Sequence, residues 1–127
     1  MNFEKVVFAF TIILALTLNF GFFIGEIDNP AHHHVLELYA AIFVNAVATI
    51  LKFGDRSHMG AVLLATSLVA DIQLVAAACV WGYSVHIADI GLTPTVMASI
   101  VSLAGGAVVA NVISVALLSI ETVLLRR

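Results

Sequence analysis

Four long runs of apolar residues, separated by short polar segments, dominate the pattern of the chain. The runs cover residues 6–25, 35–51, 59–83 and 95–120. A bilayer core about 30 Å thick is crossed by roughly 20 helical residues, so each run matches a membrane span. Lipid-exposed backbone must pair its own polar groups, and the alternating pattern of barrel strands is absent. The pattern therefore predicts an all-α membrane protein built as a four-helix transmembrane bundle.

The segments between the runs carry signals that end one helix and begin the next. Pro30 lies in a turn-rich first connection, and Ser57 is placed to cap the third helix. Thr93 followed by Pro94 is the pattern of an N-cap before a proline in the first helical position. Because the runs take up most of the chain, we expect a single transmembrane domain over residues 1–127.

Composition narrows the class of protein further. Hydrophobic residues make up 62% of the chain and charged residues 10%, whereas soluble domains carry about 25% charge. A soluble domain of this size could not bury so much apolar side chain. No hydrolase, metalloprotease or zinc-site spacing is present. We therefore expect the lipid bilayer as partner, and no enzymatic activity, cofactor or nucleic acid.

The basic residues are confined to one side of the predicted bundle. Lys5 precedes the first span, Lys52 and Arg56 lie between the second and third, and Arg126 and Arg127 follow the fourth. Lysine and arginine favour the cytoplasmic side of a membrane. The distribution predicts a protein of the bacterial inner membrane with both termini in the cytoplasm.

Asp71 is an acid in the middle of a predicted span. It lies twelve residues after Met59 and twelve before Tyr83, about 18 Å from either end of the run. A carboxyl group at that depth is costly and must face the bundle interior, a water path or a partner subunit. One interpretation is an ion or proton site. The other is a structural hydrogen bond between helices.

Polar residues on two spans are predicted to gather around this acid. Asn45 lies at a similar depth in the antiparallel second span and is the expected partner of Asp71. Ser67 precedes Asp71 by one turn, and Thr49 follows Asn45 by one turn. We predict that Asp71, Asn45, Ser67 and Thr49 form an ion pathway, and we leave open a structural role for Asn45.

Span four carries a stripe of small residues. They recur every four positions, at Ser102, Gly106, Ala110 and Ser114. Such a stripe lets another helix approach closely, either within the chain or across an interface between subunits. Asn19 and Asn111 are interpreted as interhelical hydrogen-bonding residues.

Histidines gather on the side opposite the basic residues. His33 and His34 precede Glu37 by four and three positions, and His86 lies in the other connection on that side. Imidazole and carboxylate groups bind transition metals, and histidine titrates near neutral pH. The cluster is either an outer metal or pH site or a solvated polar rim.

Two stretches carry a resemblance to a known family. Residues 51–56 lead into Gly60–Asp71, and residues 19–25 lead into residues 28–32. Together they resemble an uncharacterised family of small bacterial four-span inner-membrane proteins, a domain of unknown function. The resemblance covers nearly the whole chain and implies no activity, ligand or catalytic residue.

These observations favour passage of a small cation through a symmetric homo-oligomer, because four helices barely enclose a path. The alternative is a structural or regulatory subunit of a larger membrane complex, assembled through the small-residue stripe of span four.

Overall fold

The computed structural model describes residues 3–55 and 57–125. Four long helices account for most of these residues: α1 Phe3–Phe23, α2 Val35–Lys52, α3 His58–Gly82 and α4 Pro94–Leu125. No strand occurs in this part of the chain. The predicted all-α architecture with four spans is therefore confirmed.

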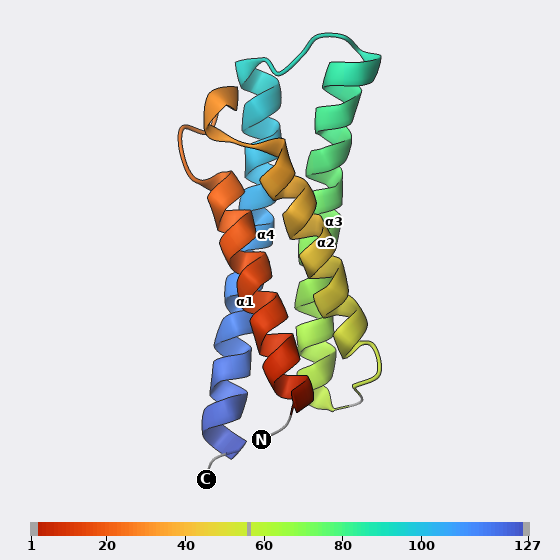
Figure 1. Ribbon diagram of the computed structural model, residues 1–127, viewed down its shortest axis with the longest axis vertical. Coiled ribbons are helices and arrows are strands. Elements are labelled where there is room, and N and C mark those ends of the chain that lie inside the picture. The colour runs from red at the N-terminus through yellow and green to blue at the C-terminus, as the bar shows by residue number, and fades with distance from the viewer. Residues whose placement is uncertain (1–2, 56, 126–127) are drawn as a thin grey trace.

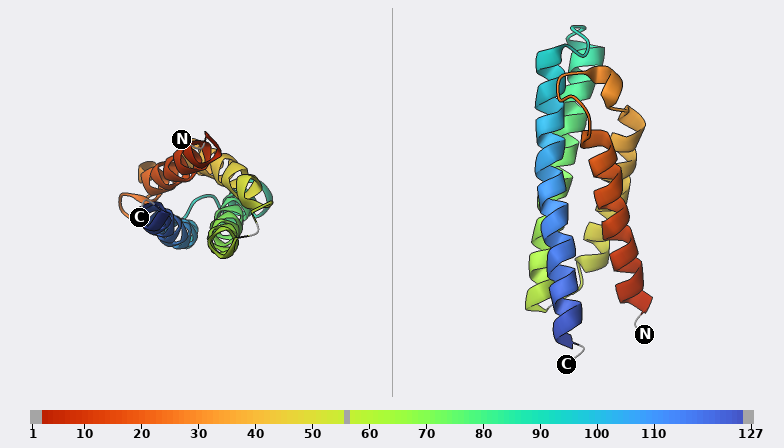
Figure 2. Two further views of the ribbon diagram at one scale, coloured as in Figure 1. Left: turned by 90° about the horizontal axis from the view of Figure 1, so that it is seen from below. Right: turned by 90° about the vertical axis from the view of Figure 1, so that its left-hand side faces the viewer.

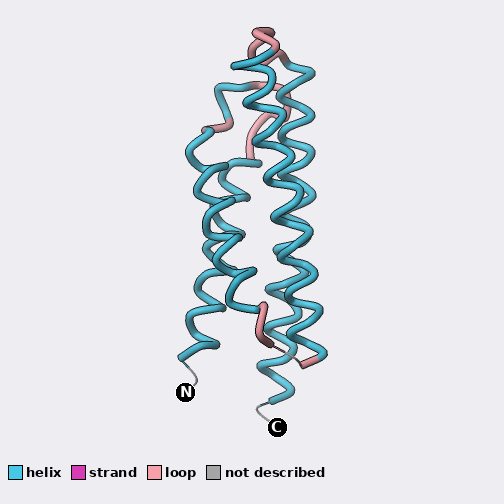
Figure 3. Tube along the Cα trace, turned by 90° about the vertical axis from the view of Figure 1, so that its right-hand side faces the viewer, coloured by secondary structure: helices cyan, strands magenta, loops and turns pink. Residues whose placement is uncertain are grey.

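The helices run alternately up and down, and each packs against the next along the chain (Figure 1). α4 also packs against α1, so the four helices close into a ring when seen along the bundle (Figure 2). Loops are confined to the two ends of the bundle (Figure 3). We call the end that holds the start of α1, the end of α4 and the α2–α3 turn the terminal end, and the opposite one the histidine end.

The helix starts form where the sequence signals predicted them. The Ser57 hydroxyl accepts a hydrogen bond of 2.9 Å from Gly60 N, and this bond caps α3. The Thr93 hydroxyl accepts one of 3.2 Å from Val96 N at the start of α4, where Pro94 is the first helical residue. The polar connections therefore supply the side chains that pair the first free N–H groups of the helices.

The ends of the helices differ from the predicted spans by a few residues. α1 begins at Phe3 rather than at residue 6, and α4 continues to Leu125 rather than stopping at 120. The third span continues past Gly82 as one π-helical segment, Tyr83–Ile87. The apolar pattern marks the length needed to cross lipid, whereas the helical backbone continues past it.

The outer faces of the helices are apolar. Large side chains such as Phe10, Phe43 and Ile72 are about two-thirds exposed. All four long helices have the length and composition to cross a membrane. Exposed apolar surface on every helix is stable in lipid rather than in water. The fold is that of a multi-pass membrane protein.

Candidate mid-bundle polar site

A layer of buried polar side chains divides the core of the bundle into two apolar clusters. One cluster, near the histidine end, includes Ala41 of α2, Ala70 of α3 and Ala110 of α4. The other, near the terminal end, includes Ala48 of α2, Leu63 of α3 and Leu118 of α4. The fully buried polar residues of these helices fall between the two clusters: Asn45, Ser67, Asn111 and Ser114. We call Asn45, Thr49, Ser67, Asp71 and Asn111 the polar layer.

Asp71 is held by two side chains of α2. Asn45 Nδ2 donates a hydrogen bond of 3.0 Å to Asp71 Oδ1. Thr49 Oγ1 donates one of 2.5 Å to Asp71 Oδ2 and also lies 3.0 Å from the Asn45 carbonyl oxygen. The expected contact between Asn45 and Asp71 is therefore present, and Thr49 is a second hydrogen-bond partner of Asp71. Asp71 itself is half-buried, whereas Asn45 and Thr49 are buried.

Several buried polar atoms of the layer have no hydrogen-bond partner among the described residues. They are Asn45 Oδ1, Ser67 Oγ, Asn111 Oδ1 and Asn111 Nδ2. The three side chains that carry them are fully buried. Leaving such an atom unpaired costs about 1–3 kcal/mol. The layer therefore holds unused hydrogen-bonding and ligand capacity in the interior of the bundle.

The register between α3 and α4 brings Asn111 to the level of Ser67 and Asp71. Thr66 and Ser114 are hydrogen-bonded through their hydroxyl groups and fix that register. With a helical rise of 1.5 Å per residue, Asn111 lies about 4.5 Å from this contact toward the histidine end. Ser67 lies about 1.5 Å and Asp71 about 7.5 Å from it in the same direction. Asn111 therefore stands between them along the axis.

Asn19 and Asn111, which the sequence does not distinguish, have different roles. With its amide oriented to pair both atoms, Asn19 donates to the Ala104 carbonyl at 3.2 Å and accepts from Val108 N at 3.0 Å. Asn19 is thus an interhelical hydrogen-bonding residue, as predicted. Asn111 makes no such bond to the described residues. The predicted interhelical hydrogen bond of Asn111 is therefore absent among the described residues.

The small-residue stripe of α4 is used largely inside the chain. A Cβ atom on Gly106 would lie 3.1 Å from the side chain of Gln73 on α3. Ala110 and Ser114 are buried, and the Ser114 hydroxyl bonds Thr66 of α3. Ser102, in contrast, is exposed. The close approach that the stripe allows is therefore mainly the packing of α4 on α3.

His33 is buried at the histidine end and bound to backbone. Its Nδ1 lies 2.5 Å from the Phe22 carbonyl oxygen and its Nε2 lies 2.7 Å from the Glu26 carbonyl oxygen. A carbonyl oxygen only accepts, so a ring nitrogen that carries a hydrogen donates it to the backbone here. His33 thereby joins the end of α1 to the loop that follows it.

The four residues predicted for an outer metal or pH site do not assemble into a metal centre. His34 and His86 are exposed, and the Glu37 carboxylate lies over Gly21 of α1. Among residues 3–55 and 57–125, no three His, Cys, Asp or Glu side chains are grouped so that they could hold a metal ion. His33 directs both ring nitrogens to backbone carbonyl oxygens, so neither nitrogen is free to bind a metal ion in this structure.

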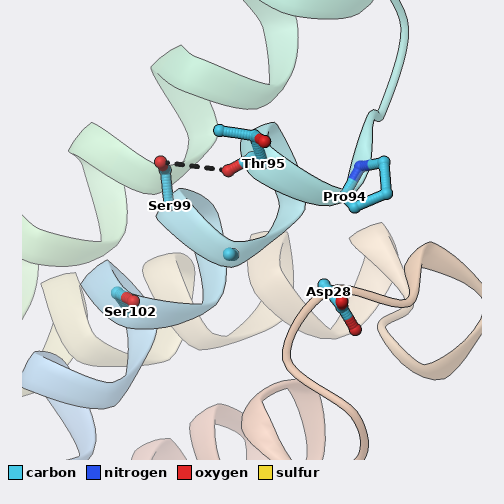
Figure 4. Close-up of a pocket in the computed structure, with 6 residues that line it drawn as sticks. Asp28, Pro94, Thr95, Ser99 and Ser102 are labelled. Atoms are coloured by element: carbon cyan, nitrogen blue, oxygen red, sulfur yellow. Dashed lines mark hydrogen bonds between the residues drawn. The ribbon is translucent and has the colours of Figure 1, made fainter.

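A hollow at the histidine end lies between the α1–α2 connection and the start of α4 (Figure 4). It is lined by Asp28 from the connection and by Thr95, Ser99 and Ser102 from α4. The Ser99 hydroxyl donates back to the Thr95 carbonyl at 3.2 Å. This hollow opens outward, so it accounts for the exposure of Ser102.

The α2–α3 turn at the terminal end is tied together by Asp55. Hydrogen bonds from the Ser57 hydroxyl, at 2.7 Å, and from Ser57 N, at 2.9 Å, hold the pKa of Asp55 below its ordinary value. Lys52, 3.4 Å away, adds attraction, and its ammonium group also lies over the Phe8 ring. Of the other basic residues of the predicted inner side, Lys5 lies in the first turns of α1. Arg56, Arg126 and Arg127 lie outside the described residues.

These features define a small multi-pass membrane protein with a polar layer in its core. Residues 32–122, more than half of the chain, match a family of unknown function, DUF6394. The chain therefore belongs to this family, and the resemblance to a family of unknown function is confirmed. No curated protein and no solved structure matches the chain.

Proposed function

We propose that this protein moves a small cation across the membrane through the polar layer, with Asp71 as the charged group at its centre. The observation that carries the proposal is a carboxylate halfway along α3, paired by Asn45 and Thr49 and next to buried polar atoms that lack partners. Ionisable groups within a span mark ion and proton pathways by default. A purely structural bond needs no unpaired neighbours.

The direction of the chain in the membrane follows from its charges. Lys5 and Lys52 belong to the terminal end, whereas Glu26, Asp28 and His34 belong to the histidine end. We infer that the terminal end faces the cytoplasm of a bacterial cell and that the histidine end faces outward. An acidic outer rim attracts cations toward the entrance of the path.

Conduction also requires a symmetric homo-oligomer. The two apolar clusters fill the bundle on both sides of the polar layer, so one copy offers no continuous wet path. Asp71 is half-buried, and its exposed part is available to an interface between copies. A ring of copies that bring their Asp71 residues toward a shared axis supplies the path. The role is transport rather than catalysis.

The alternative, an accessory subunit that docks through the stripe of α4, has less support. Ala110 and Ser114 are buried within the chain, and Gly106 lies against Gln73. Of the four stripe residues, Ser102 alone is exposed. A partner helix would therefore find most of the stripe already covered by α3.

The test is cation flux in liposomes that contain the purified full chain. Entry of protons and of ²²Na⁺ is followed under an imposed gradient for the wild type and for Asp71→Asn. We expect Asp71→Asn to reduce flux to that of empty liposomes, because the amide keeps the shape but removes the charge. Asp55→Asn, the same change at an exposed position in the α2–α3 turn, is the matched control and should leave flux unchanged. Equal flux in wild type and Asp71→Asn would contradict the proposal.

A further inference from the structure

The polar layer offers more oxygen atoms than a proton site requires. A proton binds one carboxylate oxygen and needs no other ligand. Here three oxygens of the polar layer are buried and unpaired among the described residues, namely Asn45 Oδ1, Ser67 Oγ and Asn111 Oδ1. They come from α2, α3 and α4, so three helices converge on the same level of the bundle.

We propose that the polar layer binds a dehydrated monovalent metal cation of the Na⁺ type. Its ligands are the Asp71 carboxylate and the oxygens of Asn45, Ser67 and Asn111. This inference rests on the proposed function, since it uses the same site, and it identifies the cation that the site takes.

The chemistry of the ligands selects the class of ion. Carboxylate, amide and hydroxyl oxygens are hard ligands that suit alkali and alkaline-earth cations rather than zinc or copper. The side chains of the layer contain one carboxylate, and its two oxygens already accept bonds from Asn45 and Thr49. A monovalent ion is neutralised by that single charge, whereas a divalent ion leaves an uncompensated positive charge in a medium of low polarity.

Asn111 is the residue that separates this inference from a purely structural layer. Both of its amide atoms are unpaired and fully buried, and it lies between Ser67 and Asp71 along the bundle axis. Replacing Asn111 with leucine of similar size removes unpaired polar atoms that are costly when no ion is bound. If Asn111 only packs, the change leaves the effect of sodium on stability unaltered. If Asn111 is a ligand, the change abolishes that effect.

The experiment measures the thermal stability of the purified full chain in NaCl and in choline chloride at equal ionic strength. We expect Na⁺ to raise the Tm of the wild type in a saturable manner. Asn111→Leu should raise the Tm in choline and lose the response to Na⁺. Ser67→Ala, a smaller change that folds easily, should weaken the apparent Na⁺ affinity by about tenfold. Ser99→Ala, on the exposed face of α4, is the control and should respond like the wild type.

The outcomes separate this inference from the proposed function. A wild type whose Tm is the same in sodium and choline overturns the inference, and so does an Asn111→Leu variant that still responds to sodium. If liposomes then show Asp71-dependent proton entry, the proposed function stands and the ion is the proton. Sodium-dependent stability with the expected variant pattern, but without flux of any cation, supports the site and overturns transport.

Discussion

The polar layer and the histidine end contrast in how they treat buried polar groups. At the histidine end, both ring nitrogens of His33 are bound to backbone carbonyl oxygens. In the polar layer, Ser67 and Asn111 are buried equally well, yet their polar atoms have no partner within the part of the chain that the structure describes. Both regions stood out in the sequence for their polar residues.

The hydrogen bonds of a buried polar group indicate whether its role is structural or ligand binding. A buried polar group with all its bonds made contributes to the fold and has no capacity left for a ligand. A buried group without bonds costs stability until something binds it. By this criterion His33 is structural, whereas the polar layer is the candidate site.

The largest expected effect on folding is next to the polar layer, at Gly106. A leucine there must displace Gln73, because even a Cβ atom would lie 3.1 Å from that side chain. We expect Gly106→Leu to destabilise the fold by about 3 kcal/mol, measured by unfolding in mixed detergent micelles. Ser102→Leu, one turn away and exposed, should change stability little. Equal effects from the two substitutions would show that the stripe does not pack on α3.

The second-largest expected effect on the unfolding free energy is at the histidine end. His33→Ala removes both bonds to the Phe22 and Glu26 carbonyl groups and should lower the unfolding free energy by about 2 kcal/mol. Hydrogen exchange should become faster at the end of α1, where the loop is released. His34→Ala, at an exposed neighbouring position, is the control. A His33→Ala variant with unchanged stability and altered sodium response would reverse the contrast between the two regions.

The smallest expected effect on the unfolding free energy is at the α2–α3 turn, which is remote from both the polar layer and the histidine end. The pKa of Asp55 is lowered in the folded chain, so its bonds to Ser57 stabilise the fold at neutral pH. That contribution is lost as the pH falls below about 4 and through the folded-state pKa. We expect a small drop in unfolding free energy over this range that is absent in Asp55→Asn. A drop of the same size in Asp55→Asn would assign the pH dependence to another group.

Much of the fold and part of the site could be predicted from the sequence. The lengths of the apolar runs predict the four membrane spans, because the thickness of the bilayer fixes how many helical residues a span needs. Asn45 and Asp71 lie at similar depths in the antiparallel second and third spans, and this predicts that they pair. The sequence pattern assigned Asn19 and Asn111 the same role, because the difference depends on which face each presents to a neighbouring backbone. The burial of His33 was also missed, because its partners are carbonyl oxygens that no side-chain pattern reveals.

The most direct test of cation passage through the polar layer compares one variant from the polar layer and one from the histidine end in two assays. Cation flux in liposomes and unfolding free energy are measured for Asp71→Asn and His33→Ala. We predict that Asp71→Asn loses flux and keeps most of its stability, whereas His33→Ala loses stability and keeps its flux per folded molecule. An Asp71→Asn protein that conducts like the wild type would contradict the central claim that the polar layer is the site of cation passage.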